Sequence, residues 1–198
     1  MAVYTKIGLD EINLIEKNFS IGKILNYSGI KKGIENTNYL IKSKKRKFIL
    51  TIFEKRVNSR DLPFFMKLMS GLAKSKIKCP KPVENKKGKY LFKLKGKNAC
   101  LVTFLEGKDR NILNSKECFV IGKNIAKLHN SSKKLRIFRK NSLSVNSWGP
   151  LLIKISRKIN KKFKDLTYNM KIDYIQIKNL WPKKLPTGII HCDLFLDN

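Results

Sequence analysis

The residues best suited to chemistry lie at the end of the sequence, where His191, Asp193 and Asn198 stand at the spacing H-x-D-x-x-x-x-N. A carboxylate can accept the proton of a substrate hydroxyl, and an amide oxygen can hold a magnesium ion on phosphate groups. Loops that catalyse phosphoryl transfer have this spacing. The motif therefore predicts that Asp193 is a catalytic base and Asn198 a metal ligand. We interpret His191 as a hydrogen-bonding brace of the loop.

A glycine-containing loop earlier in the chain could hold the phosphates of a nucleotide. It covers residues 29–38, between two stretches that are expected to be strands. Glycine lets the backbone approach a ligand closely, and free N–H groups can cradle phosphate oxygens. An ordinary hairpin that contains glycine is the alternative. The loop residues that we predict to contact a nucleotide are Gly29, Gly33, Asn36, Thr37 and Asn38.

A second stretch could bind the base of the same nucleotide. Residues 101–105 are apolar and are predicted to form a strand that ends where the strand-rich half of the chain gives way to helices. The extended backbone at Thr103 and Leu105 could form hydrogen bonds with an adenine edge. The alternative is a plain core strand.

The first half of the sequence is rich in strand signals, after a short amphipathic helix. Apolar residues on one face also predict a helix after Asp61, which the prolines at 80 and 82 would end. The predicted strands cover residues 22–27, 37–42, 47–53, 89–94 and 99–105, the last two as a hairpin.

From residue 106 onward the pattern is helical. Ser115 is predicted to cap a helix that runs to about His129, where a capping or packed histidine is the simpler interpretation. Two more helices are predicted over residues 148–164 and 170–181. We predict the α+β class, with a strand-rich nucleotide-binding lobe over 1–105 and a helical lobe over 106–198. The inward face of the first helix is predicted to carry Cys118, Ile121, Ile125 and Leu128.

The formal net charge of +30 would suit a protein that binds nucleic acid or another anion. The charge is mostly lysine, spread along a chain that is also rich in Asn and Ile, which favours coding bias instead. No apolar run approaches the roughly 20 residues of a membrane helix. The four cysteines lack C-x-x-C spacing, which favours reduced thiols in a cytoplasmic protein. We predict no specific nucleic-acid partner, no membrane association and a cytoplasmic location.

Together these stretches resemble the aminoglycoside-phosphotransferase-like kinases, and within them the homoserine kinases of that fold. The resemblance runs through the whole chain in order and is carried by residues 29–39, 48–56, 61–65, 102–107, 121–129 and 188–198. It implies a bilobal protein-kinase-like fold with an antiparallel-sheet N-lobe. It also implies phosphorylation of the L-homoserine hydroxyl, a step of threonine biosynthesis, with ATP and Mg²⁺ as cofactors.

The resemblance carries roles over to particular positions. Asp193 would be the catalytic base and Asn198 a magnesium ligand, while the loop 29–38 would cover the phosphates and the backbone at 103–105 would take adenine. The wider superfamily usually has Lys or Arg on its third strand to hold phosphates. The aligned position here is Thr51, which we include among the nucleotide-binding residues, and Lys55 or Arg56 could replace the missing cation.

Proteins of this family continue beyond the catalytic loop with a second metal-binding Asp and further helices of the substrate pocket. The sequence therefore resembles an N-terminal portion, and we expect the 198-residue chain to have little kinase activity and poor solubility. Two alternatives stay open. One is a kinase for another hydroxylated metabolite, such as choline, an aminoglycoside or a methylthio-sugar. The other is a non-catalytic basic protein that binds nucleic acid or other anions.

Overall fold

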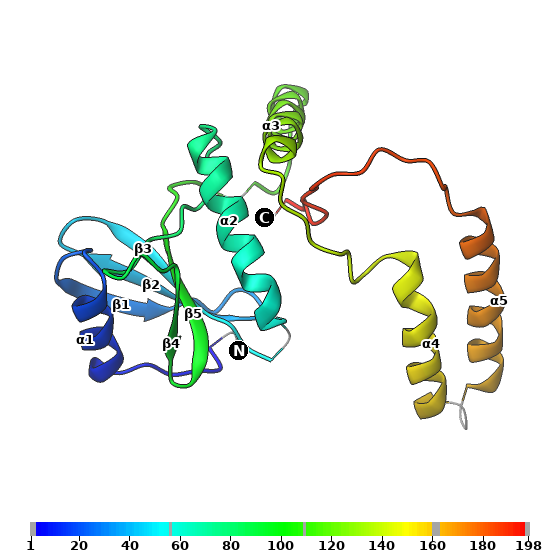
Figure 1. Cartoon of the computed structure of the whole chain (residues 1–198), viewed down its shortest axis with the longest axis horizontal. Helices are drawn as coiled ribbons and strands as arrows, with labels where there is room; N and C mark the ends of the chain where they lie inside the picture. Colours follow the sequence, from blue (N-terminus) through cyan, green and yellow to red (C-terminus); the bar gives the residue numbers. More distant parts are fainter. Residues whose placement is uncertain (1–2, 56, 109, 160–162, 197–198) are drawn as a thin grey trace. The chain divides into compact units, whose positions relative to one another are not determined.

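The computed structural model describes residues 3–55, 57–108, 110–159 and 163–196, and the chain forms two compact units. The first unit contains residues 1–138 together with 188–198, and the second contains residues 139–187. Helices and strands both occur (Figure 1), so the predicted α+β class is confirmed. The lobe boundary at residues 105 and 106 stays a prediction, because the compact units divide the chain at other positions.

A five-stranded antiparallel sheet forms the centre of the first unit (Figure 1). Its strands lie in the order β1-β2-β3-β5-β4. Each of the predicted strands is present, with ends that differ by a few residues. Their bounds are β1 (Ile24–Gly29), β2 (Thr37–Ser43), β3 (Lys47–Ile52), β4 (Leu91–Leu94) and β5 (Lys97–Thr103).

Side chains of the sheet alternate between two faces, because successive residues of a strand point to opposite sides. On β3, Leu50 and Ile52 are fully buried against the side that carries α1 (Leu9–Asn18), where Ile15 and Phe19 join the same cluster. The preceding residue, Ile49, belongs to the other face, where α2 (Leu62–Lys74) packs after a short 3₁₀ turn at Ser59–Asp61. One helix therefore covers each face of the sheet.

Helix α3 (Ser115–Lys134) is longer than predicted, and its cap is one residue earlier. The Asn114 side chain accepts a hydrogen bond from the Glu117 N–H at 2.9 Å, and the Glu117 carboxylate accepts one from the Asn114 N–H at 3.0 Å. This reciprocal capping box makes the prediction of Ser115 as the cap wrong.

The predicted inward face of α3 is also partly wrong. Cys118 and Ile121 are exposed, and only Ile125 and Leu128 are half-buried. Beyond the C-terminal end of the helix, Leu135 packs on Gly71 of α2. The contact lies at that end, and the residues near the start of the helix stay open to solvent.

The second unit is a pair of helices, α4 (Val145–Ile159) and α5 (Lys164–Leu180). The rings of Trp148 and Trp181 meet edge to face with centroids 5.6 Å apart, which closes the open end of the pair. The helix predicted over residues 170–181 corresponds to α5. Its predicted start at residue 170 is wrong, since α5 begins at Lys164. Among the described residues, no helix is long and apolar enough to cross a membrane.

Candidate active site

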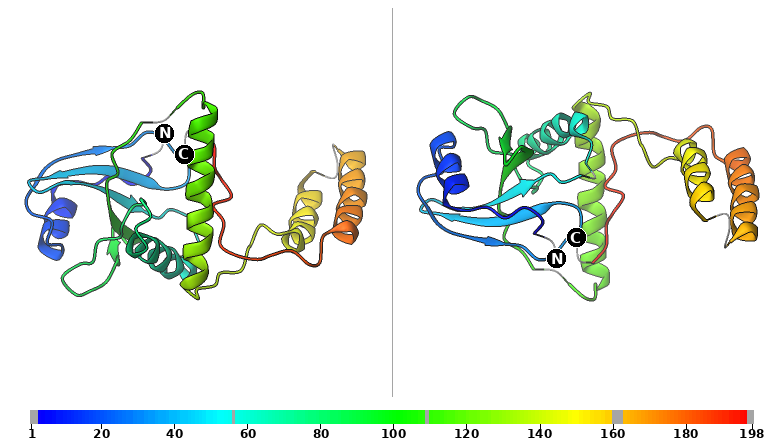
Figure 2. Two further views of the ribbon diagram at one scale, coloured as in Figure 1. Left: turned by 90° about the horizontal axis from the view of Figure 1, so that it is seen from above. Right: turned by 90° about the horizontal axis from the view of Figure 1, so that it is seen from below.

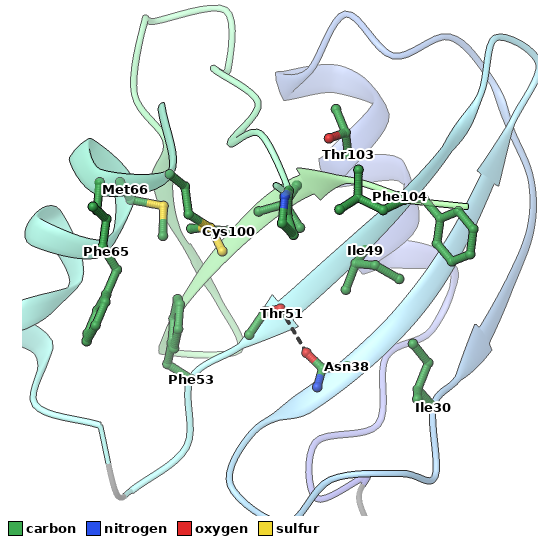
Figure 3. Close-up of a pocket in the computed structure, with 15 residues that line it drawn as sticks. Ile30, Asn38, Ile49, Thr51, Phe53, Phe65, Met66, Cys100, Thr103 and Phe104 are labelled. Carbon is green, nitrogen blue, oxygen red and sulfur yellow. Dashed lines mark hydrogen bonds between the residues drawn. The ribbon is translucent and has the colours of Figure 1, made fainter. Parts of the chain in front are cut away.

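A cavity of about 540 Å³ lies between the sheet and α2 (Figure 3). The sheet contributes residues of β2, β3 and β5, and α2 contributes an aromatic and methionine wall. The lining residues are Ile30, Asn38, Ile49, Thr51, Phe53, Phe65, Met66, Leu68, Met69, Pro80, Cys100, Val102, Thr103, Phe104 and Leu105. The lining is almost entirely apolar, so the cavity suits a flat, weakly polar group.

The alternation of the strands explains why these residues share the cavity. On β5, Ala99 and Leu101 face the α1 side, so Cys100 and Val102 face α2. On β3, Ile49 and Thr51 point to the cavity for the same reason. Burial raises the pKa of the Cys100 thiol to about 12, so this cysteine is a neutral wall residue.

Two polar side chains interrupt the apolar lining at adjacent strands. Asn38 of β2 and Thr51 of β3 are direct cross-strand partners, and the Thr51 hydroxyl donates to Asn38 Oδ1 at 2.8 Å (Figure 3). The structure thus brings together two residues that the sequence predicted for nucleotide binding. Lys55 is exposed, and Arg56 lies outside the described residues.

The end of β5 and the segment after it reach the same cavity through Thr103 and Leu105, whose predicted role in adenine binding stays a prediction. Part of its backbone is already engaged. The Thr103 N–H donates to the Lys81 carbonyl at 2.9 Å, and the Phe104 N–H donates to the Lys47 carbonyl at 3.3 Å. A base that bound here by backbone hydrogen bonds would therefore use the carbonyls of the segment or the Leu105 N–H.

The glycine loop joins β1 to β2 and reaches the cavity at both ends, through Ile30 and Asn38. The Ile30 N–H donates to the Asn38 carbonyl at 2.8 Å, which closes the base of the loop. Gly33 has a φ of +93°, a left-handed conformation that favours glycine, and open space around it. Asn36 instead accepts a hydrogen bond from the Glu54 N–H at 3.3 Å.

Thr37 belongs to the loop by sequence, but its side chain is fully buried on the α1 face of the sheet. Its hydroxyl oxygen accepts hydrogen bonds from the Tyr4 and Thr5 N–H groups and donates to Glu54. The Thr37 side chain therefore serves the fold, and only its backbone could face a nucleotide. No pattern in the sequence pointed to this cluster, because its members come from three distant segments.

The residues of the C-terminal motif that the structure describes are exposed. The segment from residue 188 returns to the first unit and runs beside α3 (Figure 2). His191 and Asp193 both face solvent, and Cys192 between them has a φ of +67°, in the left-handed region. Their roles stay predictions. Asn198 lies outside the described residues, and among those described no three His, Cys, Asp or Glu side chains could hold a metal ion.

The sequence did not reveal the α2 wall of the cavity. Phe65, Met66 and Met69 look like ordinary residues of an apolar helix face, and the same face also packs a core. The only available signal was that β3 and β5 are apolar on both faces, which requires a cover on each side. That signal predicts that a helix covers this face of the sheet, but it does not predict the cavity between the helix and the sheet.

Comparison with known proteins places the chain in a family. A model of the phosphotransferase enzyme family, APH, matches residues 26–198. The homoserine kinase of Methylorubrum populi is 38% identical over 198 residues, which are all of this chain and 62% of that protein. The homoserine kinase of Agrobacterium fabrum is 41% identical over 200 residues and is covered to the same 62%. The chain therefore spans less than two thirds of the length of these curated relatives.

Solved structures show the same fold at lower identity. Spectinomycin phosphotransferase in complex with ADP and spectinomycin matches with a TM-score of 0.66 and 17% identity, over 98% of this chain and 65% of that one. The AMP-bound complex of that enzyme matches with a TM-score of 0.65, also at 17% identity, over 98% of this chain and 66% of that one. Since the family model covers most of the sequence and the fold agrees, the chain belongs to the phosphotransferase enzyme family.

Proposed function

We propose that the chain is the ATP-binding and catalytic-loop portion of a homoserine kinase. The observation that supports nucleotide binding is the cavity. Its lining is mostly apolar and includes the hydrogen-bonded pair Asn38 and Thr51, next to the end of the glycine loop. An adenine ring needs apolar surfaces on its two faces and a few polar groups at its edge. The nucleotide complexes of spectinomycin phosphotransferase, which has the same fold, support this proposal.

Each part of the nucleotide has a proposed partner. The adenine lies between the sheet and α2, and its edge meets the backbone at Thr103 and Leu105. The phosphates lie under the loop 29–38, where the backbone N–H groups near Gly33 can approach them. Because Thr51 is uncharged, the many lysines of the first unit supply the attraction for the triphosphate through their summed field.

The proposed reaction transfers the γ-phosphoryl group to a hydroxyl. The hydroxyl oxygen attacks the γ-phosphorus, the bond to the bridging oxygen of ADP breaks, and the Asp193 carboxylate takes the hydroxyl proton. His191 holds the loop that carries Asp193. A magnesium ion on the phosphates would neutralise their charge, and Asn198 is the residue proposed to hold it.

L-Homoserine is the proposed acceptor, because relatives named homoserine kinase match the whole chain at 36–41% identity. This would make the protein part of threonine biosynthesis. Choline, aminoglycosides and methylthio-sugars are acceptors that a related kinase could use instead. The cavity does not distinguish among them, since it is proposed to hold the nucleotide.

Calorimetric titration of the 198-residue chain tests the nucleotide part. ATP, ADP and adenosine should each bind, with Kd values in the range of roughly 1 μM to 1 mM that enzymes show for their substrates. Val102→Trp should block all three, because its ring would fill the cavity. Val120→Trp is the matched control, since Val120 is exposed on α3. Absence of binding by the wild-type chain would refute an ATP site here.

The catalytic loop is tested with a chimaera in which residues 1–198 are followed by the remaining part of the Agrobacterium fabrum homoserine kinase, which supplies the further helices of the substrate pocket. ADP release is measured with L-homoserine, choline, spectinomycin and a methylthio-sugar, in the presence of magnesium. The expected result is a clear preference for L-homoserine. A preference for another acceptor would contradict the substrate, and activity of the isolated chain would contradict the expectation that it is nearly inactive.

A further inference from the structure

The segment before α1 contacts the glycine loop at three places. At the start of the loop, a Cβ on Gly29 would lie 2.8 Å from Val3 Cγ2, so only glycine allows this approach. At the tip, the Tyr4 hydroxyl donates to the Ile34 carbonyl at 2.9 Å. At the end, the Tyr4 N–H donates to Thr37 Oγ1 at 3.0 Å.

The same segment is anchored firmly to β2. The Thr5 N–H also donates to Thr37 Oγ1, at 3.1 Å, and the Tyr39 hydroxyl donates to the Thr5 carbonyl at 3.0 Å. The Ile7 N–H donates to the Tyr39 hydroxyl oxygen at 3.3 Å. Thr37 and Tyr39 are buried, so these bonds are shielded from water.

A charged pair fastens this anchor to the rest of the sheet. Glu54 Oε1 accepts hydrogen bonds from the Thr5 and Thr37 hydroxyls at 2.7 and 2.8 Å. Lys97 Nζ donates to Thr5 Oγ1 at 2.7 Å and to the second oxygen of Glu54. The Glu54 side chain, in the segment that follows β3, is only 10% exposed, so the anchor joins residues of β2 and β5 around a nearly buried carboxylate.

We propose that residues 3–7 are a clamp that sets the conformation of the glycine loop 29–38. Tyr4 is the positioning residue, because its hydroxyl holds the tip of the loop at Ile34. The inference rests on the proposed function, because it concerns the loop that is proposed to cover the ATP phosphates. A loop with two glycines has many conformations, and ordering it on a ligand weakens binding. The clamp holds the loop in one conformation before the phosphates arrive.

Tyr4 suits this test because it can be changed without touching the core. Its side chain is 56% exposed, and Tyr4→Phe removes only the hydroxyl that reaches Ile34. Tyr168→Phe is the matched control, since Tyr168 is exposed on α5 in the other unit. Both variants lose one phenolic hydroxyl, so any difference between them reflects its location.

The first measurement is amide hydrogen exchange of residues 31–36 in the 198-residue chain without nucleotide. Loss of one hydrogen bond should speed exchange in Tyr4→Phe by about fivefold. The control should exchange like the wild type. Unchanged exchange in Tyr4→Phe would overturn the clamp, whether or not the chain binds ATP.

The second measurement compares the affinities for ATP and for adenosine. The clamp predicts that Tyr4→Phe binds ATP about fivefold more weakly and adenosine as tightly as the wild type, because only ATP has phosphates for the loop. An equal loss for both ligands would indicate a general structural defect and would also overturn the clamp. Failure of the wild-type chain to bind either ligand would refute the proposed function, and the exchange measurement would then decide the clamp alone.

Discussion

The Thr51 hydroxyl donates to Asn38 Oδ1 at 2.8 Å across the β2–β3 pair, inside the cavity. Because the amide oxygen is occupied by this bond, the orientation of the Asn38 side chain is fixed and its NH₂ group stays available as a donor. A neutral amide donor thus lies close to where the resemblance predicted a Lys or Arg. The pair gives the proposed nucleotide site a polar group of defined direction without a buried charge.

Thr51→Val should weaken ATP binding by about fivefold, since the Asn38 amide loses the hydrogen bond that orients it. Thr51→Ser keeps the hydroxyl and should bind ATP nearly as the wild type does. Calorimetric titration of the 198-residue chain measures both. Equal affinities for the Val and Ser variants would show that the hydroxyl has no part in the site.

Asp193→Asn should lower kcat of the chimaera by about a hundredfold or more, because the amide cannot accept the proton of the acceptor hydroxyl. The Kd for ATP should stay unchanged, since Asp193 is not among the residues that line the cavity. Steady-state kinetics with L-homoserine and a separate ATP titration give the two values. Near-normal turnover of the variant would show that the catalytic motif has been misassigned.

The stability of the first unit should fall in acid because of Glu54. Burial of this carboxylate opposes its ionisation, but hydrogen bonds from Lys97, Thr5 and Thr37 outweigh burial and hold its pKa below the ordinary value of 4.5. A lowered pKa means that the charged form stabilises the fold above pH 4.5. The contribution is lost as the pH falls through the lower, folded-state pKa.

Glu54→Gln should therefore be less stable than the wild type at pH 7, by about 1–2 kcal/mol, and the difference should shrink toward pH 3. Urea denaturation at a series of pH values measures it. A difference that stayed constant over this range would mean that the Glu54 charge does not contribute to stability.

Two glycine substitutions should act in opposite directions. A Cβ on Gly71 of α2 would lie 2.5 Å from Leu135 Cδ2, so Gly71→Ala should destabilise the α2–α3 contact by about 1–2 kcal/mol. Gly122 lies in α3 with open space around it, so Gly122→Ala should stabilise that helix by about 0.5–1 kcal/mol.

Thermal unfolding of the two variants compares these effects. Leu135→Ala should remove the penalty of Gly71→Ala in the double variant, since the crowding side chain is gone. A penalty that persisted in the double variant would place its cause elsewhere.

The sheet could be predicted because its strands are apolar runs separated by clear turns, and β2 and β3 also alternate in burial. Phe48, Leu50 and Ile52 share the more deeply buried face of β3. Their alternation can be seen within a few residues of sequence, without knowledge of distant partners. The inward face of α3 was predicted less well. Hydrophobic periodicity shows which side of a helix is apolar, but it cannot show whether another element covers Cys118 and Ile121.

The candidate site could be predicted only in part for a similar reason. Asn38, Thr51, Thr103 and Leu105 were all predicted, and the structure collects them around one cavity. The role of Thr37 depends on partners at positions 4, 5 and 54, and no local pattern encodes contacts over such separations. Sequence reasoning therefore located residues that line the cavity better than the residues that hold the neighbouring backbone in place.

The clamp has a consequence for how the protein folds during its synthesis. Thr5 and Lys97, which share a hydrogen bond, are 92 positions apart, so the segment 3–7 leaves the ribosome long before β5 exists. Its bonds to Thr37, Tyr39 and Glu54 can form once β1, β2 and β3 have emerged, but the contact with Lys97 must wait until β5 has been made. The anchor of the glycine loop is therefore completed in two stages, the first with β2 and the second only when β5 has joined the sheet.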